Sequence, residues 1–334
     1  MKPKPSLIDV AKRANVAIST VSRTISGKGK ISEETQEIVR KAMRELGYKP
    51  NRVARRLRSP VGSGGLIGLI IPNIQNPFFA DVARGVEDTA YLQKYAVLLC
   101  NYDENEQKQQ FYLDVLQSES VDGIIIPPLN EDDPAIRQLV RSGLPVVCVD
   151  RSVTNCDIDR VGVDNRRGAF DAVQHLIERG HRRIGIITGP RNSSTGRGRL
   201  QGYRDAHELA GIPIEEELIC IGEFKEQCGR EQTARLLDMR KPPTALFTCS
   251  SLTTIGALTI IAERKVRIPE QLALVGFDDM QLADVYTPPL SMVSQPAYDV
   301  GRCAAELLFK RIQHTKIPPT NIVLSPRLIV RKSS

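Results

Sequence analysis

The sequence predicts two structural classes in one chain, namely a small all-α domain at the N-terminus and a larger α/β domain with parallel sheets. The first 50 residues contain three short segments with helical periodicity and capping residues. From Leu66 onward, apolar runs alternate with amphipathic stretches, which is typical of parallel strands joined by crossover helices. At 334 residues and 41% hydrophobic content, the chain is long enough for two or three cores.

The first two predicted helices lie close together in the sequence. The first is expected to begin after Ser6, which can cap its N-terminal amides, and Asp9 three residues later approximates a capping box. Its buried face is expected to hold Leu7, Val10, Ala11 and Ala14. After a short break, AISTVSRTIS offers a second helix with Val21 and Ile25 on the buried side. The residues expected to face outward are Ile18, Ser19, Thr20, Ser22 and Arg23.

A third helix is predicted within SEETQEIVRKAMRELG, with Ser32 as its cap and Gly47 as its stop. Its apolar stripe is expected to hold Ile38, Ala42 or Met43, and Leu46. Two helices joined by a tight turn, the second polar and cationic, are typical of a helix-turn-helix whose second helix lies in the DNA major groove. Exposed Ser, Thr and Arg also occur on any small polar helix, so these residues alone leave both interpretations open.

Charge is distributed unevenly along the chain. Residues 1–60 contain 15 Lys and Arg against 5 Asp and Glu, a balance of +10, whereas the whole chain carries +7. A basic N-terminal region on a mildly acidic body indicates that this region meets a polyanion. Within it, NRVARRLRSP (residues 51–60) is either a solvated basic linker or a helix too short to be stable by itself in water.

Several other classes of protein are disfavoured. The longest apolar runs, such as LIGLIIP, are far below the roughly 18 residues of a membrane span, and we expect a cytoplasmic protein without membrane contact. The seven cysteines show no C-x-x-C pair and are expected to be buried, reduced thiols, and the four histidines are too dispersed for a zinc site. Dinucleotide, P-loop and nucleophile-elbow motifs do not occur, so the sequence predicts no catalytic residue, cofactor or metal.

Ligands of parallel α/β sheets bind at the carboxyl ends of the strands, so the turns after the apolar runs matter most. In PNIQNPFF, Asn76 can cap a helix and place Phe78 and Phe79 at the crevice, where they either stack on a ligand or pack in the core, Phe79 being the better core candidate. The arginine-rich segment GPRNSSTGRGRLQGY is expected to be a ligand-holding loop or a solvated loop. Asp278 and Asp279 could act as bases, but no partner group is visible.

The segments LIDVAKRANVAISTVSRTIS and YKPNRVARRL resemble the DNA-binding head and hinge of the lactose-repressor (LacI/GalR) family of bacterial transcriptional regulators, and the match extends through essentially the whole chain. The resemblance implies a helix-turn-helix head over residues 1–50 and a hinge helix over 51–60, with Leu57 as a minor-groove wedge. It departs at Ala17, where relatives usually carry a capping serine. The implied DNA-binding residues are Ser6, Ile18, Ser19, Thr20, Ser22, Arg23, Asn51, Arg52, Val53, Ala54 and Leu57.

The same resemblance implies a periplasmic-binding-protein-like body, with an effector bound between two doubly wound α/β lobes. The implied lobes are residues 66–163 plus 295–324, and residues 164–294 plus 325–331. Arg199 would bind effector oxygens, Asp278 would accept hydrogen bonds, and Phe224 would cover an apolar face. The implied effector-binding residues are Phe78, Asp150, Thr195, Arg199, Phe224, Ser250 and Asp278.

These expectations combine into a homodimeric, sequence-specific repressor that binds a palindromic operator in double-stranded DNA and responds to a sugar, sugar acid or sugar derivative. The effector class stays open, because Ser250 and Ser251 replace the Asn-Asp pair of many sugar-binding relatives, and Ser193 replaces the arginine of purine-responsive ones. One alternative is an architectural DNA binder whose body senses a protein corepressor. A transport solute-binding protein is less favoured, because it has no use for a basic head.

Overall fold

The computed structural model describes residues 5–26, 29–48, 65–314 and 317–334. The chain divides into two compact units, Met1–Gly65 (the head) and Leu66–Ser334 (the body), and each is considered by itself. The predicted hinge, with Asn51, Arg52, Val53, Ala54 and Leu57, lies outside the described residues. In the described part of the chain, no helix combines the length and the apolar character needed to cross a membrane.

The described residues of the head form three helices, as the sequence predicts: α1 (Leu7–Ala14), α2 (Ile18–Ser26) and α3 (Glu33–Leu46). The predicted capping box is present, because the Ser6 side chain accepts from the Asp9 amide and the Asp9 carboxylate accepts from the Ser6 amide. At the end of α3, Gly47 adopts a left-handed backbone with φ 63°. The helices share one core of Val10, Ala11, Ala14, Val21, Val39 and Ala42.

The predicted stripe of α3 is wrong at one position. Ile38 is 45% exposed, and Val39 is buried in its place. Residues 38, 42 and 46 are spaced by four, so their direction drifts around a helix that repeats every 3.6 residues. Val39, Ala42 and Leu46 follow the i, i+3, i+7 spacing of a single face and therefore pack against α1 and α2.

The first sheet of the body has strand order β11-β5-β4-β3-β1-β2, and its strands are parallel. Its strands are β1 (Leu66–Ile71), β2 (Ala96–Asn101), β3 (Gly123–Ile126), β4 (Val146–Val149), β5 (Asp159–Val163) and β11 (Asn321–Leu324). Its helices are α5 (Pro77–Leu92), α6 (Glu106–Ser118), α7 (Pro134–Arg141) and α12 (Ala297–Gln313). Within β1, Leu69 packs with α5 and α12, whereas the next residue, Ile70, packs with α6. Burial on both faces explains why the strands are continuous apolar runs.

The second sheet has strand order β12-β10-β9-β8-β6-β7. Its strands are β6 (Ile184–Thr188), β7 (Ile219–Ile221), β8 (Ala245–Thr248), β9 (Ala273–Phe277), β10 (Ser291–Ser294) and β12 (Arg327–Ile329). Its helices are α8 (Asn165–Glu178), α9 (Ser194–Leu209), α10 (Glu226–Leu237) and α11 (Ser251–Glu263). The edge strand β12 is antiparallel to β10, and the other pairs are parallel. The predicted α/β fold with mostly parallel sheets is confirmed.

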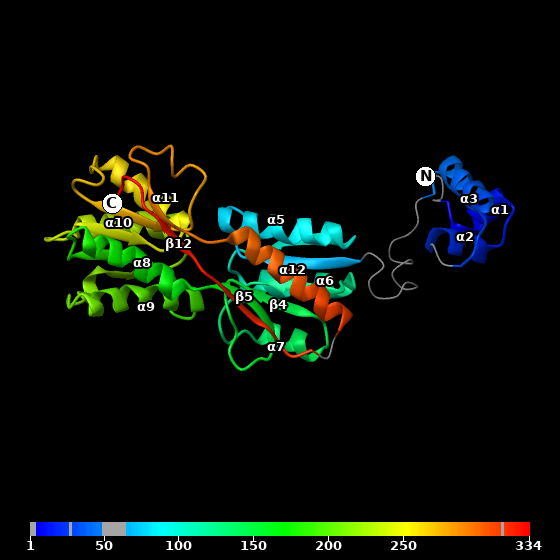
Figure 1. Ribbon diagram of the computed structural model, residues 1–334, viewed down its shortest axis with the longest axis horizontal. Helices are drawn as coiled ribbons and strands as arrows, with labels where there is room; N and C mark the ends of the chain where they lie inside the picture. Colours follow the sequence, from blue (N-terminus) through cyan, green and yellow to red (C-terminus); the bar gives the residue numbers. More distant parts are fainter. Residues whose placement is uncertain (1–4, 27–28, 49–64, 315–316) are drawn as a thin grey trace. The chain divides into compact units, whose positions relative to one another are not determined.

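The described part of the body passes between the two sheets three times, which Figure 1 shows as the segments that connect its two lobes. The first passage follows β5, which ends at Val163, and leads to α8. The second follows β10, which ends at Ser294, and leads to α12. The third joins β11, which ends at Leu324, to β12. Both lobes therefore contain segments that are far apart in the sequence.

The segment GPRNSSTGRGRLQGY is helical from Ser194 onward, and the expectation of a loop is wrong there. The helix α9 begins at Ser194, directly after β6 and a short turn. Each glycine is roughly 1 kcal/mol less favourable than alanine in a helix interior, so the composition of this segment did not indicate a helix. Close packing requires these glycines: a Cβ at Gly202 would lie 2.2 Å from the Arg166 carbonyl oxygen, and one at Gly196 would lie 2.7 Å from the Pro190 carbonyl oxygen.

Candidate functional site

The surface of α2 is the first candidate site. Its fully buried residue is Val21, and the opposite side is open to solvent. The predicted reading residues Ile18 (47% exposed), Ser19 and Arg23 are exposed, and Thr20 and Ser22 are half-buried. α1 is followed by its C-cap residue Asn15, whose φ of 53° begins the tight turn of a helix-turn-helix. Ser6 is exposed, but its hydroxyl also donates to Asp9 at 2.7 Å, so the helix cap already uses this side chain.

The second candidate site is a pocket in the body with a cavity volume of about 30 Å³. It lies at the carboxyl ends of the parallel strands, the place where such folds bind ligands. The seven residues nominated from the sequence all line it: Phe78, Asp150, Thr195, Arg199, Phe224, Ser250 and Asp278. Seven further residues line it: Pro72, Asn73, Asn76, Phe79, Glu104, Arg151 and Gln295. Of these, Phe79 was considered from the sequence as a ligand-stacking or core residue, and the other six were not predicted as effector contacts.

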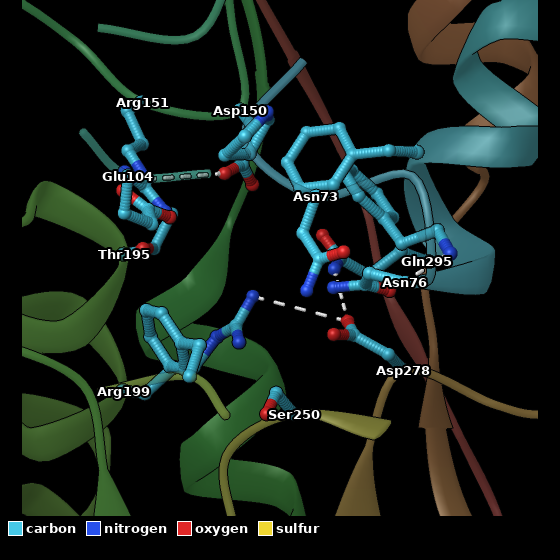
Figure 2. A pocket seen from close by; sticks show the side chains of 14 residues that line it. Asn73, Asn76, Glu104, Asp150, Arg151, Thr195, Arg199, Ser250, Asp278 and Gln295 are labelled. Carbon is cyan, nitrogen blue, oxygen red and sulfur yellow. Dashed lines mark hydrogen bonds and ion pairs between the residues drawn. The ribbon is translucent and has the colours of Figure 1, made fainter. Parts of the chain in front are cut away.

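Arg199 projects into this pocket from α9, as Figure 2 shows, and is only 3% exposed. Its Nε donates to Asn165 Oδ1 at 2.7 Å, and its Nη1 donates to the Cys249 carbonyl oxygen at 2.5 Å. The guanidinium also lies 3.8 Å from the centre of the Phe277 ring. Two of its three nitrogens therefore bind the protein itself, which leaves less of the guanidinium for a ligand than the sequence suggested.

Asp278 lies across the pocket from Arg199. Its Oδ1 is 3.9 Å from Arg199 Nη2 and accepts a hydrogen bond from Gln295 Nε2 at 2.5 Å (Figure 2). Burial raises the pKa of Asp278, and Arg199 opposes this effect. Gln295 Oε1 is buried and has no hydrogen-bond partner. This corner of the pocket therefore presents an acceptor that a bound molecule could satisfy.

A second charged group comprises Glu104, Asp150 and Arg151. Glu104 accepts two hydrogen bonds from Arg151, at 2.7 and 2.5 Å, in a bidentate ion pair. Arg151 Nε has no hydrogen-bond partner and lies 3.7 Å from Asp150 Oδ2. Burial raises the pKa of Asp150 to about 6, although Arg151 and Arg199 act in the opposite direction. A buried, weakly compensated carboxylate at a strand end is a feature of functional sites.

The three carboxylates that line the pocket share an uncommon backbone conformation. Glu104, Asp150 and Asp278 have φ values of 55°, 61° and 71°, in the left-handed region. They follow β2, β4 and β9. Non-glycine residues adopt this region at a cost of about 1–3 kcal/mol, and such residues cluster at ligand sites. The chain thus turns sharply at three strand ends and presents a carboxylate at each.

The remaining lining side chains supply apolar surface and hydroxyls. Phe78 and Phe79 are both buried, with ring centres 5.0 Å apart in an edge-to-face arrangement, so both belong to the core and to the pocket wall. Phe224 packs directly over Gly189, where a Cβ would lie 2.1 Å from the ring. The Ser250 hydroxyl caps α11, and the Thr195 hydroxyl lies 2.8 Å from that of Ser193. Both hydroxyls are therefore partly committed to the protein.

Contacts across the pocket hold the two lobes together. Ser251 Oγ donates to Asn76 Oδ1 at 3.2 Å, and the Ser152 amide donates to Ser194 Oγ at 3.1 Å. Glu131 of one lobe also forms a bidentate ion pair with Arg197 of the other. The lobes must move apart before a molecule much larger than water can enter a cavity of about 30 Å³.

The other candidates lie outside this pocket. Asp279 pairs with Arg331 at 2.9 and 3.1 Å, which is a structural role. His175 lies on α8 with its Nε2 2.9 Å from Ser334 Oγ. Among the described residues, no group of three or more His, Cys, Asp or Glu side chains is placed to hold a metal ion. All seven cysteines are free thiols.

Comparison with known proteins extends over both units. The description "Bacterial regulatory proteins, lacI family" matches residues 6–51, and "Periplasmic binding protein-like domain" matches residues 173–334. Catabolite control protein A of Priestia megaterium is 33% identical over 98% of this chain and 99% of that protein. The structure of the transcriptional regulator CelR in complex with cellobiose matches with 34% identity and a TM-score of 0.76, covering 99% of this chain and 100% of that one.

The structure of the lac repressor dimer bound to operator and the anti-inducer ONPF matches with a TM-score of 0.86 and 25% identity, covering 99% of both chains. The matches thus include both the helix-turn-helix head and the pocket-bearing body. The chain belongs to the lacI family of bacterial regulatory proteins.

Proposed function

We propose that this chain is a homodimeric repressor that binds a palindromic operator through its head and a small metabolite through the pocket in its body. The observation that carries the proposal is that side chains from the segments that follow strands β1, β2, β4, β6, β7, β8, β9 and β10 meet in one pocket. Two relatives support the assignment, since one was solved with cellobiose and another as a dimer bound to operator. The pocket binds its ligand without changing it, and the protein acts in the cytoplasm, where its DNA is.

In the head, Ile18, Ser19 and Arg23 read base edges, and Thr20 and Ser22 support them from the same helix. Ser6 contacts the DNA backbone from the start of α1. Outside the described residues, Asn51, Arg52, Val53 and Ala54 belong to the hinge, and Leu57 is inserted between base pairs at the operator centre.

In the body, residues 66–163 with 295–324 form one lobe and residues 164–294 with 325–331 form the other. The effector lies between them, in contact with Phe78, Asp150, Thr195, Arg199, Phe224, Ser250 and Asp278. Because the ligand contacts both lobes, its binding biases their relative position and thereby the hinge. A typical coupling of about 1–3 kcal/mol would change operator affinity about 5- to 150-fold.

In the test, the full chain first selects the DNA duplexes that it binds from a pool of random sequence. We expect an inverted repeat with two half-sites. Arg23→Ala should lower affinity for this repeat by about 1–3 kcal/mol and relax the preference at one position in each half-site. Arg40→Ala is the matched control, because Arg40 is an exposed arginine on α3 that bonds Gln36. Selection of no preferred sequence would contradict the proposal.

The hinge assignment has its own test. Leu57→Ala should lower operator affinity and operator bending, because an apolar wedge is lost, while non-specific binding and its salt dependence stay nearly unchanged. Affinity is measured by fluorescence anisotropy on the selected repeat and on a scrambled duplex. An equal loss on both duplexes would contradict the wedge role of Leu57.

A further inference from the structure

The head carries two exposed isoleucines that line the same hollow of its surface, where α1 meets α2. Ile8 of α1 is 51% exposed, and Ile18, the first residue of α2, is 47% exposed. Val16 and Ala17, from the turn between the two helices, line the hollow with them. Neither isoleucine belongs to the core that holds the three helices together. Their exposure therefore points to a role outside the folding of the head.

The place of this hollow indicates what covers it, and this step rests on the proposed function. In a helix-turn-helix, the N-terminal residues of the second helix approach the base edges in the major groove. Ile18 is the first residue of that helix. The exposed Lys12 also lines the hollow, and its positive charge suits the phosphates that border a DNA groove. An apolar surface beside a cation thus suits a base edge that lies next to a phosphate backbone.

The base edges of the major groove differ in the property to which an isoleucine responds. Guanine, adenine and cytosine present hydrogen-bond acceptors and donors there, whereas thymine adds the C5 methyl group. An isoleucine packed against a donor or an acceptor removes water from that group and gives it no partner, which costs free energy. Packed against a methyl group, the same side chain buries apolar surface on both molecules. Exposed isoleucines at this place therefore favour thymine.

We propose that Ile8 and Ile18 together contact the C5 methyl group of one thymine in each operator half-site, and that this contact makes thymine the preferred base at that position. Ala17 supports the contact. The serine that relatives usually carry there would place a hydroxyl at the hollow, whereas alanine keeps this side of it apolar. Ile8 on α1 thereby becomes a specificity-determining residue, in addition to the residues of α2.

The first experiment changes the DNA and leaves the protein unmodified. Deoxyuridine presents the same hydrogen-bonding groups as thymine and lacks only the methyl group. It replaces each thymine of the selected inverted repeat in turn, symmetrically in both half-sites, and fluorescence anisotropy measures binding of the full chain. One buried methyl group corresponds to about 4-fold in affinity, so we expect a loss of about 15-fold at one thymine position. Half-sites in which no thymine responds would overturn the inference.

The second experiment asks whether the two isoleucines sense that methyl group. In Ile8→Ala and in Ile18→Ala, the loss caused by deoxyuridine should shrink from about 15-fold to about 4-fold or less, because less apolar surface meets the methyl group. Ile38→Ala is the matched control, because Ile38 is an isoleucine of the head that is 45% exposed, lies on α3 and does not line the hollow. This control should retain the full loss.

Each comparison is a ratio of two affinities of the same protein, so a change in the stability of a variant head cancels. A loss that stays near 15-fold in either Ile8→Ala or Ile18→Ala would refute the shared contact with the methyl group. A selected repeat that is indifferent to its methyl groups would leave the repressor of the proposed function in place. Selection of no inverted repeat would instead refute the proposed function itself.

Discussion

Asp150 should destabilise the folded protein at neutral pH. Burial raises its pKa from 3.8 to about 6, so the folded state holds a proton between these pH values that the unfolded state has released. Stability therefore falls as the pH rises through this window, and the full cost is present above pH 6. At 1.36 kcal/mol per pKa unit, the shift corresponds to about 3 kcal/mol at pH 7.5 and about 1 kcal/mol at pH 4.5.

Asp150→Asn removes the ionisable group and should therefore raise the free energy of unfolding by the amount that the buried charge costs. We expect the variant to be more stable than the unmodified chain by up to about 3 kcal/mol at pH 7.5, with a gain that shrinks towards pH 4.5. Urea unfolding of the full chain at both pH values measures the difference, with exposed Asp157→Asn as the control. A gain that is independent of pH, or a loss of stability at pH 7.5, would refute the reasoning about this buried carboxylate.

Three further changes test other parts of the structure. Gly189→Ala should displace Phe224, because the new Cβ would lie 2.1 Å from its ring, and calorimetry should show about tenfold weaker effector binding. An unchanged affinity would contradict the assignment of Phe224 to the pocket wall. Glu131→Gln should weaken effector binding only about 1.5- to 5-fold, because its ion pair with half-exposed Arg197 is screened by solvent; a loss above tenfold would contradict this. Val21→Ala should destabilise the head by about 1–3 kcal/mol and lower operator binding in urea, with effector binding unchanged in calorimetry.

Much of the fold could be predicted from local sequence chemistry. Capping residues at Ser6, Ser32 and Asn76 begin helices in the structure as their chemistry suggests. Continuous apolar runs became parallel strands, because both sheet faces are covered by helices. The strand-end rule then directed attention to the turns that follow the apolar runs, and the family resemblance supplied the seven pocket residues. These features depend on short-range patterns, which a single sequence records directly.

The unpredicted features depend on tertiary contacts. Glu104 and Arg151 follow different strands, and their ion pair becomes visible only when β2 and β4 are placed in one sheet. Gln295 reaches the pocket because β10 ends beside β9, from which Asp278 comes. The glycine-rich start of α9 looked like a loop because propensity was weighed without the close helix contacts that require glycine.

The most direct test of the account is the operator affinity of the full chain with and without a ligand of the pocket, identified by a thermal-shift screen of sugars, sugar acids, sugar phosphates and purines. Anisotropy on the selected inverted repeat measures this affinity. The account predicts that saturating ligand changes this affinity about 5- to 150-fold. A ligand that occupies the body and leaves operator affinity unchanged would contradict the claim that the pocket controls DNA binding.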